Sequence, residues 1–136
     1  MIATAANVEP SQLKIRALGL ISGMFYTRRF DEIGIFLPKI LYGKNYKRSA
    51  FAPFTNPEHP DIVKNLPPCF LITSHDDHLR QYTLDFASAL RRNETECELM
   101  DFGEDEHLTH AFSVFDPNMK ESREVLSRIA NFFTHH

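Results

Sequence analysis

Tryptophan is absent from this sequence of 136 residues, and cysteine occurs only twice. No apolar run approaches the roughly 18 residues that a membrane-spanning helix needs, so we expect no membrane span. An excess of basic residues is also missing, because the formal net charge is -3, and this argues against a nucleic-acid-binding protein. The N-terminus lacks a basic region followed by an apolar core, so we predict no signal peptide.

The composition that is present belongs to a folded domain. Hydrophobic residues make up 43% of the chain and charged residues 24%, which excludes intrinsic disorder. The two cysteines, Cys69 and Cys97, each lie near the start of a predicted strand. Two buried thiols in a reducing cytoplasm are the favoured interpretation, and a disulfide bond is the alternative. We therefore expect a cytoplasmic location.

Short apolar runs alternate along the chain with stretches of helical periodicity. Such runs suit strands buried on both faces of a parallel sheet, whereas apolar positions three or four residues apart indicate helices with one buried face. The pattern predicts strands over residues 15–21, 69–74 and 96–102, helices over residues 79–92 and 119–133, and a short helix near residues 31–42. This order predicts an α/β fold with about three parallel strands flanked by helices.

Residues 24–65 differ from the rest of the chain, because aromatic and basic side chains are interleaved there and four prolines interrupt them. Beyond the short helix, this stretch has no strong periodicity and is expected to form loops. A segment of this length inside a compact domain usually forms a lid, a pocket wall or an insertion. We therefore predict a cap or pocket insertion over about residues 24–65.

Two of the predicted strands are followed by polar loops whose residues can do acid–base chemistry. Asp77 follows one strand and His110 follows the next. Functional loops in parallel α/β sheets lie beyond the carboxyl ends of the strands, so both side chains are expected at one edge. A carboxylate there can hold an imidazole in one tautomer, and the imidazole can take a proton from a nucleophile. Phe112 is placed to keep water out of this site. On spacing alone, an ordinary surface carboxylate and surface histidine remain the alternative.

The residue order in these two segments resembles a known family. Residues 66–80 read Leu-Pro-Pro-x-x-Leu-Ile-Thr-x-x-x-Asp-x-Leu-Arg, which resembles the acid-bearing segment of hormone-sensitive-lipase-like carboxylesterases of the α/β-hydrolase fold. That family's segment reads close to Asp-Pro-Leu-Arg-Asp, so His78 replaces the usual proline and Gln81 the usual second acid. His110-Ala111-Phe112 is similar to the family's His-Gly-Phe, with alanine in place of glycine.

This resemblance implies that residues 1–136 form a single partial domain, the C-terminal half of an α/β-hydrolase fold. It implies a serine carboxylesterase or lipase that acts on short acyl esters, with Asp77 as the acid and His110 as the general base of its catalytic triad. The resemblance implies no cofactor and no metal. Phe25 and Tyr26 lie in the segment that looks like the cap and acyl pocket, and together with Phe112 they are the expected substrate-binding residues.

The nucleophile that this triad needs is missing, because the 136 residues contain no Gly-x-Ser-x-Gly turn. Ser22 is no substitute, since Gly23 directly adjoins it, and we expect Ser22 to end a strand. The chain by itself is therefore expected to be inactive as an esterase. Its expected partners are a small acyl ester, and either the missing N-terminal half or a second copy bound through an exposed sheet edge.

Two functions of other classes stay open at this stage. One is a non-catalytic interaction module, a truncated hydrolase-like half that binds a partner through the aromatic and basic stretch over residues 24–54. The other is a metal site, because nitrogen and oxygen ligands suitable for zinc occur in both loops, although their spacing is not a strong zinc signature. The candidate ligands are His75, His78, His107 and His110, with Asp76 and Asp77 beside them.

Overall fold

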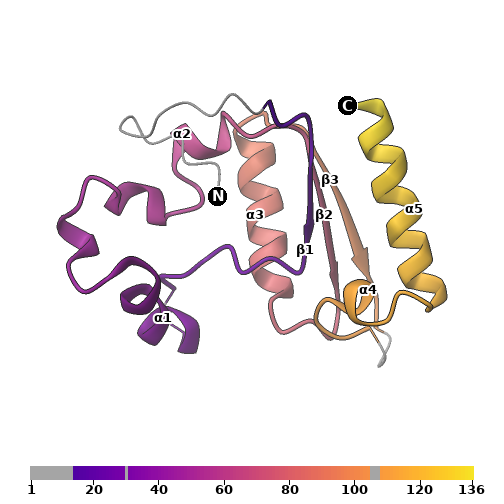
Figure 1. Cartoon of the computed structure of the whole chain (residues 1–136), viewed down its shortest axis with the longest axis horizontal. Helices are drawn as coiled ribbons and strands as arrows, with labels where there is room; N and C mark the ends of the chain where they lie inside the picture. Colours follow the sequence, from indigo (N-terminus) through magenta and orange to yellow (C-terminus); the bar gives the residue numbers. More distant parts are fainter. Residues whose placement is uncertain (1–13, 30, 105–107) are drawn as a thin grey trace.

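The computed structural model describes residues 14–29, 31–104 and 108–136, and its centre is a parallel three-stranded sheet (Figure 1). The strands are β1 (Leu18–Ile21), β2 (Cys69–Ser74) and β3 (Cys97–Phe102), and they lie side by side in that order. The register places Leu18 opposite Cys69 and Cys69 opposite Cys97. The predicted set of three parallel strands is confirmed.

Helices cover both faces of this sheet. Figure 1 shows α3 (Arg80–Arg92) on one face and α5 (Lys120–His135) on the other, which confirms the predicted flanking helices. The short helix α4 (Phe112–Phe115) lies near the carboxyl ends of the strands. Between β1 and β2, the chain forms the helices α1 (Glu32–Tyr42) and α2 (Pro60–Val63) and the 3-10 helices η1 (Tyr46–Arg48) and η2 (Ala52–Thr55).

The central strand explains why residues 69–74 read as a continuous apolar run. All six residues of β2 are buried, and alternate side chains point to opposite faces of the sheet. Leu71 packs in the cluster on the α3 side, whereas Phe70 and Ile72 pack in the cluster on the α5 side. Each of these side chains contributes roughly 1.5–3 kcal/mol by burial, so β2 anchors the loop that follows it.

The segment between β1 and β2 is attached to α3 through polar and aromatic contacts. The Asp31 side chain caps α1 by accepting a hydrogen bond from the Gly34 N–H, and it also accepts one from the Tyr82 hydroxyl of α3. The Arg29 guanidinium lies 3.6 Å from the centre of the Tyr26 ring and forms an ion pair with Asp85. The predicted helix near 31–42 is confirmed, but the rest is not all loop, because η1, η2 and α2 follow it.

Cys69 and Cys97 are adjacent in the register of β2 and β3, and both are free thiols. Two thiols without a disulfide are therefore confirmed, but only Cys69 is buried as predicted, because Cys97 is partly exposed. Cys69 is fully buried, and burial raises the pKa of its thiol to about 12, so this thiol stays protonated and unreactive at neutral pH. Within the described part of the chain, no helix is both long and apolar enough to cross a membrane.

Candidate active site

Asp77 lies in the tight turn that joins β2 to α3, at the carboxyl end of the central strand. Its backbone N–H donates to the Ser74 carbonyl at 3.2 Å, and its own carbonyl accepts from the Arg80 N–H at 2.8 Å. These bonds close the turn and begin α3. The Asp77 side chain has no exposed surface, which is costly for a carboxylate unless hydrogen bonds replace water.

The required hydrogen bonds come from both sides of the turn. The Leu79 N–H donates to Asp77 Oδ1 at 2.8 Å, and the Thr73 hydroxyl lies 3.2 Å from Oδ2. His110 approaches from beyond β3, and its Nδ1 lies 2.9 Å from Asp77 Oδ1. The two side chains are 33 positions apart in the sequence, so the parallel sheet brings together the acid and the histidine.

His110 is held by contacts on its own loop. The Ser74 hydroxyl donates to the Leu108 carbonyl, and Leu108 is buried in the cluster on the α5 side. Ala111 then adopts the left-handed conformation with φ of 53° and leads into α4. With Nδ1 bound to Asp77, the Nε2 atom of His110 is the ring nitrogen left to meet a reactant, and the side chain is 35% exposed.

Ser22 joins β1 to this site. It is the first residue after β1, as predicted, and its backbone N–H donates to the Ile72 carbonyl at 2.9 Å. The Ser22 side chain is buried, and its hydroxyl oxygen accepts a hydrogen bond from the Ala111 N–H at 3.0 Å. The hydroxyl proton is then free to donate to the Asp77 carboxylate. Sequence reasoning missed this contact, because Ser22 and Ala111 are 89 positions apart.

The ionisation of Asp77 follows from these contacts. Burial by itself would raise the pKa of the carboxyl group, but the hydrogen bonds from Ser22, Leu79 and His110 oppose it. The charge of His110 acts in the same direction, and the net result is a pKa below the ordinary value of 3.8. Asp77 is therefore ionised at neutral pH and can stabilise a positive charge on His110.

The aromatic residues expected to bind substrate lie in different surroundings. Phe112 is buried against Phe102, with the ring centres 5.3 Å apart, directly after the His110 loop. Phe25 stacks on Phe86 of α3, with ring centres 4.3 Å apart. Tyr26 packs edge-on against Tyr82. Phe25 and Tyr26 thus attach their segment to α3, and their predicted role in substrate binding stays a prediction.

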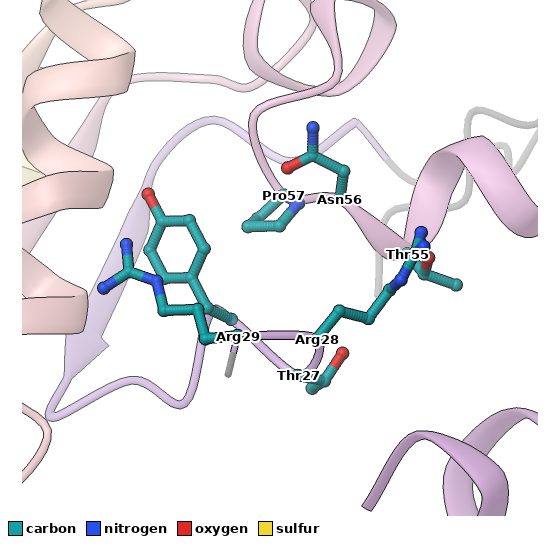
Figure 2. A pocket seen from close by; sticks show the side chains of 7 residues that line it. Thr27, Arg28, Arg29, Thr55, Asn56 and Pro57 are labelled. Atoms are coloured by element: carbon teal, nitrogen blue, oxygen red, sulfur yellow. Dashed lines mark hydrogen bonds between the residues drawn. The ribbon is translucent and has the colours of Figure 1, made fainter. Parts of the chain in front are cut away.

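Tyr26 also lines a cavity of about 340 Å³ between the segment after β1 and the η2 region (Figure 2). Figure 2 shows the Arg28 side chain reaching toward Thr55, and the Arg28 guanidinium donates to the Thr55 hydroxyl at 3.0 Å. The lining residues are Tyr26, Thr27, Arg28, Arg29, Thr55, Asn56 and Pro57. Neither Asp77 nor His110 belongs to this lining, so this cavity is separate from the acid–histidine pair.

The candidate metal ligands are only partly brought together. Among the described residues, Asp77, His78 and His110 have ligand atoms that all lie within 4.8 Å of one another. His75 and Asp76 do not join this group. His107 lies outside the described residues.

The arrangement of strands and helices matches solved structures of esterases. Esterase B from Lactobacillus rhamnosis superposes with a TM-score of 0.78 at 17% identity, covering 94% of this chain and 42% of that esterase. An esterase from Pyrobaculum calidifontis gives a TM-score of 0.59 at 21% identity, covering 86% of this chain and 42% of that one. An esterase/lipase from an uncultured bacterium gives a TM-score of 0.62 at 16% identity, covering 88% of this chain and 42% of that protein.

The chain has the fold of the C-terminal part of an α/β-hydrolase. It spans about 42% of the length of these esterases. No protein-family model and no curated protein sequence matches the chain.

Proposed function

We propose that Asp77 and His110 are the acid and the general base of a serine carboxylic ester hydrolase. The observation that carries this proposal is the 2.9 Å contact between His110 Nδ1 and the buried Asp77 carboxylate at the carboxyl ends of β2 and β3. This contact leaves Nε2 as the proton acceptor, which is the orientation that a catalytic histidine needs. The esterase structures that share the fold support the same chemistry.

In the proposed reaction, His110 Nε2 takes the proton of a serine hydroxyl as the serine oxygen attacks the ester carbonyl. The protonated imidazole is stabilised by Asp77 and returns the proton to the departing alcohol. In the second half, His110 takes a proton from water as the water oxygen attacks the acyl carbonyl. The bond from the acyl carbon to the serine oxygen then breaks, His110 returns the proton to that oxygen, and the acyl group leaves as a carboxylic acid. The serine and the oxyanion donors belong to the part of a hydrolase domain that corresponds to the other half of the esterases.

Short acyl esters are the proposed substrates. A solved structure of the Lactobacillus esterase contains a C4-C4 SN3 tributyrin phosphonate inhibitor, which supports a short acyl chain. Phe112 is the best placed of the three expected substrate-binding residues, because it follows the His110 loop directly. Phe25 and Tyr26 would act indirectly, by fixing the segment over residues 24–65 against α3.

The open edge of β1 is the proposed attachment point for the nucleophile-bearing half. Among the described residues, β1 has a strand neighbour on one side only, which is β2. An unpaired edge readily accepts a further strand, so we expect a complex with that half or a homo-oligomer. Free thiols at Cys69 and Cys97 support the proposal of a reducing, cytoplasmic location.

Labelling with a fluorophosphonate tests the proposed hydrolysis. The reagent is added to a preparation of the chain with its co-purifying proteins, and the intact mass of every polypeptide is recorded. We expect a probe-sized mass shift on a polypeptide with a Gly-x-Ser-x-Gly turn, and we expect His110→Gln to abolish this shift. The shift should remain in His75→Gln, because His75 is exposed and outside the acid–histidine pair. A shift that persists in His110→Gln, or one on Ser22, would contradict the proposal.

A non-catalytic interaction module is the second candidate function. The observation in its favour is an apolar surface on α1, where four large side chains are at least half exposed: Ile35, Phe36, Ile40 and Leu41. Exposed apolar groups of this size commonly mark a contact with another protein. The absence of any labelled polypeptide would favour this second function over hydrolysis.

A further inference from the structure

His78 and His110 form a pair of neighbouring imidazoles that acid–base catalysis does not require. Their ring centres lie 4.6 Å apart at an angle of 45°. His78 belongs to the turn between β2 and α3, whereas His110 lies beyond β3, so the sheet and the turn bring the pair together. Imidazole nitrogen is a favoured ligand of zinc, copper and nickel.

The nitrogen of His110 that is available to a cation is Nε2, because Nδ1 lies 2.9 Å from Asp77 Oδ1. A metal-binding histidine typically donates its other ring N–H to a carboxylate, which fixes the ring and makes the coordinating nitrogen more basic. Asp77 already provides this support from its buried position. His110 is therefore oriented as a metal ligand as well as a general base.

His78 can adjust to reach the same cation. Its side chain is 69% exposed, and its Nδ1 lies 4.0 Å from Asp77 Oδ1, beyond hydrogen-bonding distance. One ligand atom from each of Asp77, His78 and His110 lies within 4.8 Å of the others. Nitrogen ligands of a tetrahedral zinc ion are about 3.4 Å apart, given Zn–N bonds of about 2.0–2.1 Å. The ring centres of His78 and His110 are 4.6 Å apart, so rotation of the exposed His78 ring can bring one of its nitrogens to this separation from His110 Nε2.

The local charge favours a divalent cation. The turn carries two adjacent carboxylates, the exposed Asp76 and the buried Asp77. The nearest cationic residue along the chain, Arg80, is engaged in a two-bond ion pair with Asp101, at 3.0 and 2.7 Å. Its charge is largely compensated there, so it does little to repel a cation.

We propose that His78 and His110 bind a divalent transition-metal cation such as Zn²⁺. Water completes its coordination, and Asp77 holds the His110 ring through a hydrogen bond to Nδ1. The cation would occupy His110 Nε2, the atom that takes the proton from the serine in the proposed hydrolysis. The cation is therefore a reversible inhibitor and not a cofactor. Binding of the cation is independent of the proposed hydrolysis, whereas inhibition rests on it.

Calorimetric titration of the full chain with Zn²⁺ tests the binding. The background for every variant is His135→Gln/His136→Gln, because the two C-terminal histidines offer a competing site. We expect one bound zinc ion, an affinity at least about tenfold weaker in His78→Gln and in His110→Gln, and an unchanged affinity in His75→Gln. Circular dichroism establishes that each variant is folded. An affinity unaffected by His78→Gln, or weakened equally by His75→Gln, would overturn the proposal.

Zinc-dependent labelling separates this proposal from the proposed function. In a preparation that reacts with the fluorophosphonate, Zn²⁺ should slow labelling, and His78→Gln should remove most of this effect while labelling without zinc continues. Labelling that zinc slows equally in the background and in His78→Gln would overturn the inhibitory role. If zinc binding depends on His78 in a preparation in which no serine is labelled, the metal site is supported. That result would count only against the proposed hydrolysis.

Discussion

The hydroxyl oxygen of Ser22 accepts a hydrogen bond from the backbone N–H of Ala111 at 3.0 Å. One end of this contact is the first residue after β1, and the other is the residue directly after His110. Because the Ser22 hydroxyl also helps to lower the pKa of the Asp77 carboxyl group, a single side chain links the edge strand to the acid and to the loop that carries His110. Ser22 and Ala111 have positive φ angles, 47° and 53°, which non-glycine residues rarely adopt.

Replacement of Ser22 by alanine should destabilise the fold and raise the pKa of Asp77. The Ala111 N–H would lose its acceptor, which costs about 1–2 kcal/mol, and the carboxylate would lose one donor. Urea unfolding measures the first effect, and NMR titration of the carboxyl carbon measures the second. The control is Ser88→Ala, an exposed serine of α3 whose loss should change stability by less than about 0.5 kcal/mol. Equal effects of the two substitutions would contradict the role of Ser22.

Replacement of Ala111 by glycine should stabilise the protein. A left-handed conformation costs a residue with a Cβ atom about 1–2 kcal/mol, and glycine avoids this cost. Part of the resulting gain in stability is offset by the greater freedom of glycine in the unfolded chain. We expect a net increase of about 1 kcal/mol in the free energy of unfolding. Ala130→Gly, at an exposed position inside α5, is the matched control and should lower the free energy of unfolding by about 1 kcal/mol. Destabilisation by both substitutions would show that Ala111 is not left-handed.

The contact between Asp31 and Tyr82 should make stability depend on pH in the acid range. The Tyr82 hydroxyl and the backbone N–H groups at the start of α1 lower the pKa of Asp31 below 3.8. A folded-state pKa below the unfolded value gives stability that is complete above about pH 4 and is lost as the pH falls through the folded pKa. Tyr82→Phe should weaken this dependence.

The control for this pH effect is Asp31→Asn, since asparagine caps a helix about as well as aspartate but does not ionise. Urea unfolding between pH 7 and pH 3 should show that Asp31→Asn loses less stability at acid pH than the unmodified chain does. An identical pH profile in the two proteins would contradict a lowered pKa for Asp31.

The open edge of β1 should cause concentration-dependent association when the nucleophile-bearing half is absent. Sedimentation velocity over a range of concentrations measures this association. The double substitution Phe36→Glu/Ile40→Glu charges the exposed surface of α1 without touching β1, so association through the edge should persist in it. A stable monomer at high concentration, or dissociation caused by the α1 substitutions, would contradict pairing through the β1 edge.

The central strand could be predicted from sequence because it is a continuous apolar run, and the flanking helices because their apolar positions recur with the helical period. Strand β2 occupies residues 69–74 as predicted, since its side chains are buried on both faces. Strand β1 is shorter than the predicted 15–21, because Ile15 is exposed and pairing with β2 begins at Leu18. The helices η1, η2 and α2 escaped prediction because three or four residues are too few to show a period.

The proximity of Asp77 and His110 could be predicted, because each follows a strand and parallel strands place such loops at one edge. Their catalytic role stays a prediction. The Ser22 contact could not be found in this way, because it depends on the pairing of β1 with β2. Spacing alone grouped His75 with His78, whereas the turn after β2 brings only His78 to His110.

Long-range ¹H–¹⁵N NMR of the histidine rings in this chain measures directly whether Asp77 holds His110 with Nε2 as the proton acceptor. At a pH where His110 is neutral, we expect its proton to reside on Nδ1, and we expect Asp77→Asn to abolish this preference. An exposed histidine such as His75 should show a mixture of tautomers in both proteins. A proton on Nε2 of His110, or a tautomer unaffected by Asp77→Asn, would contradict this role of Asp77.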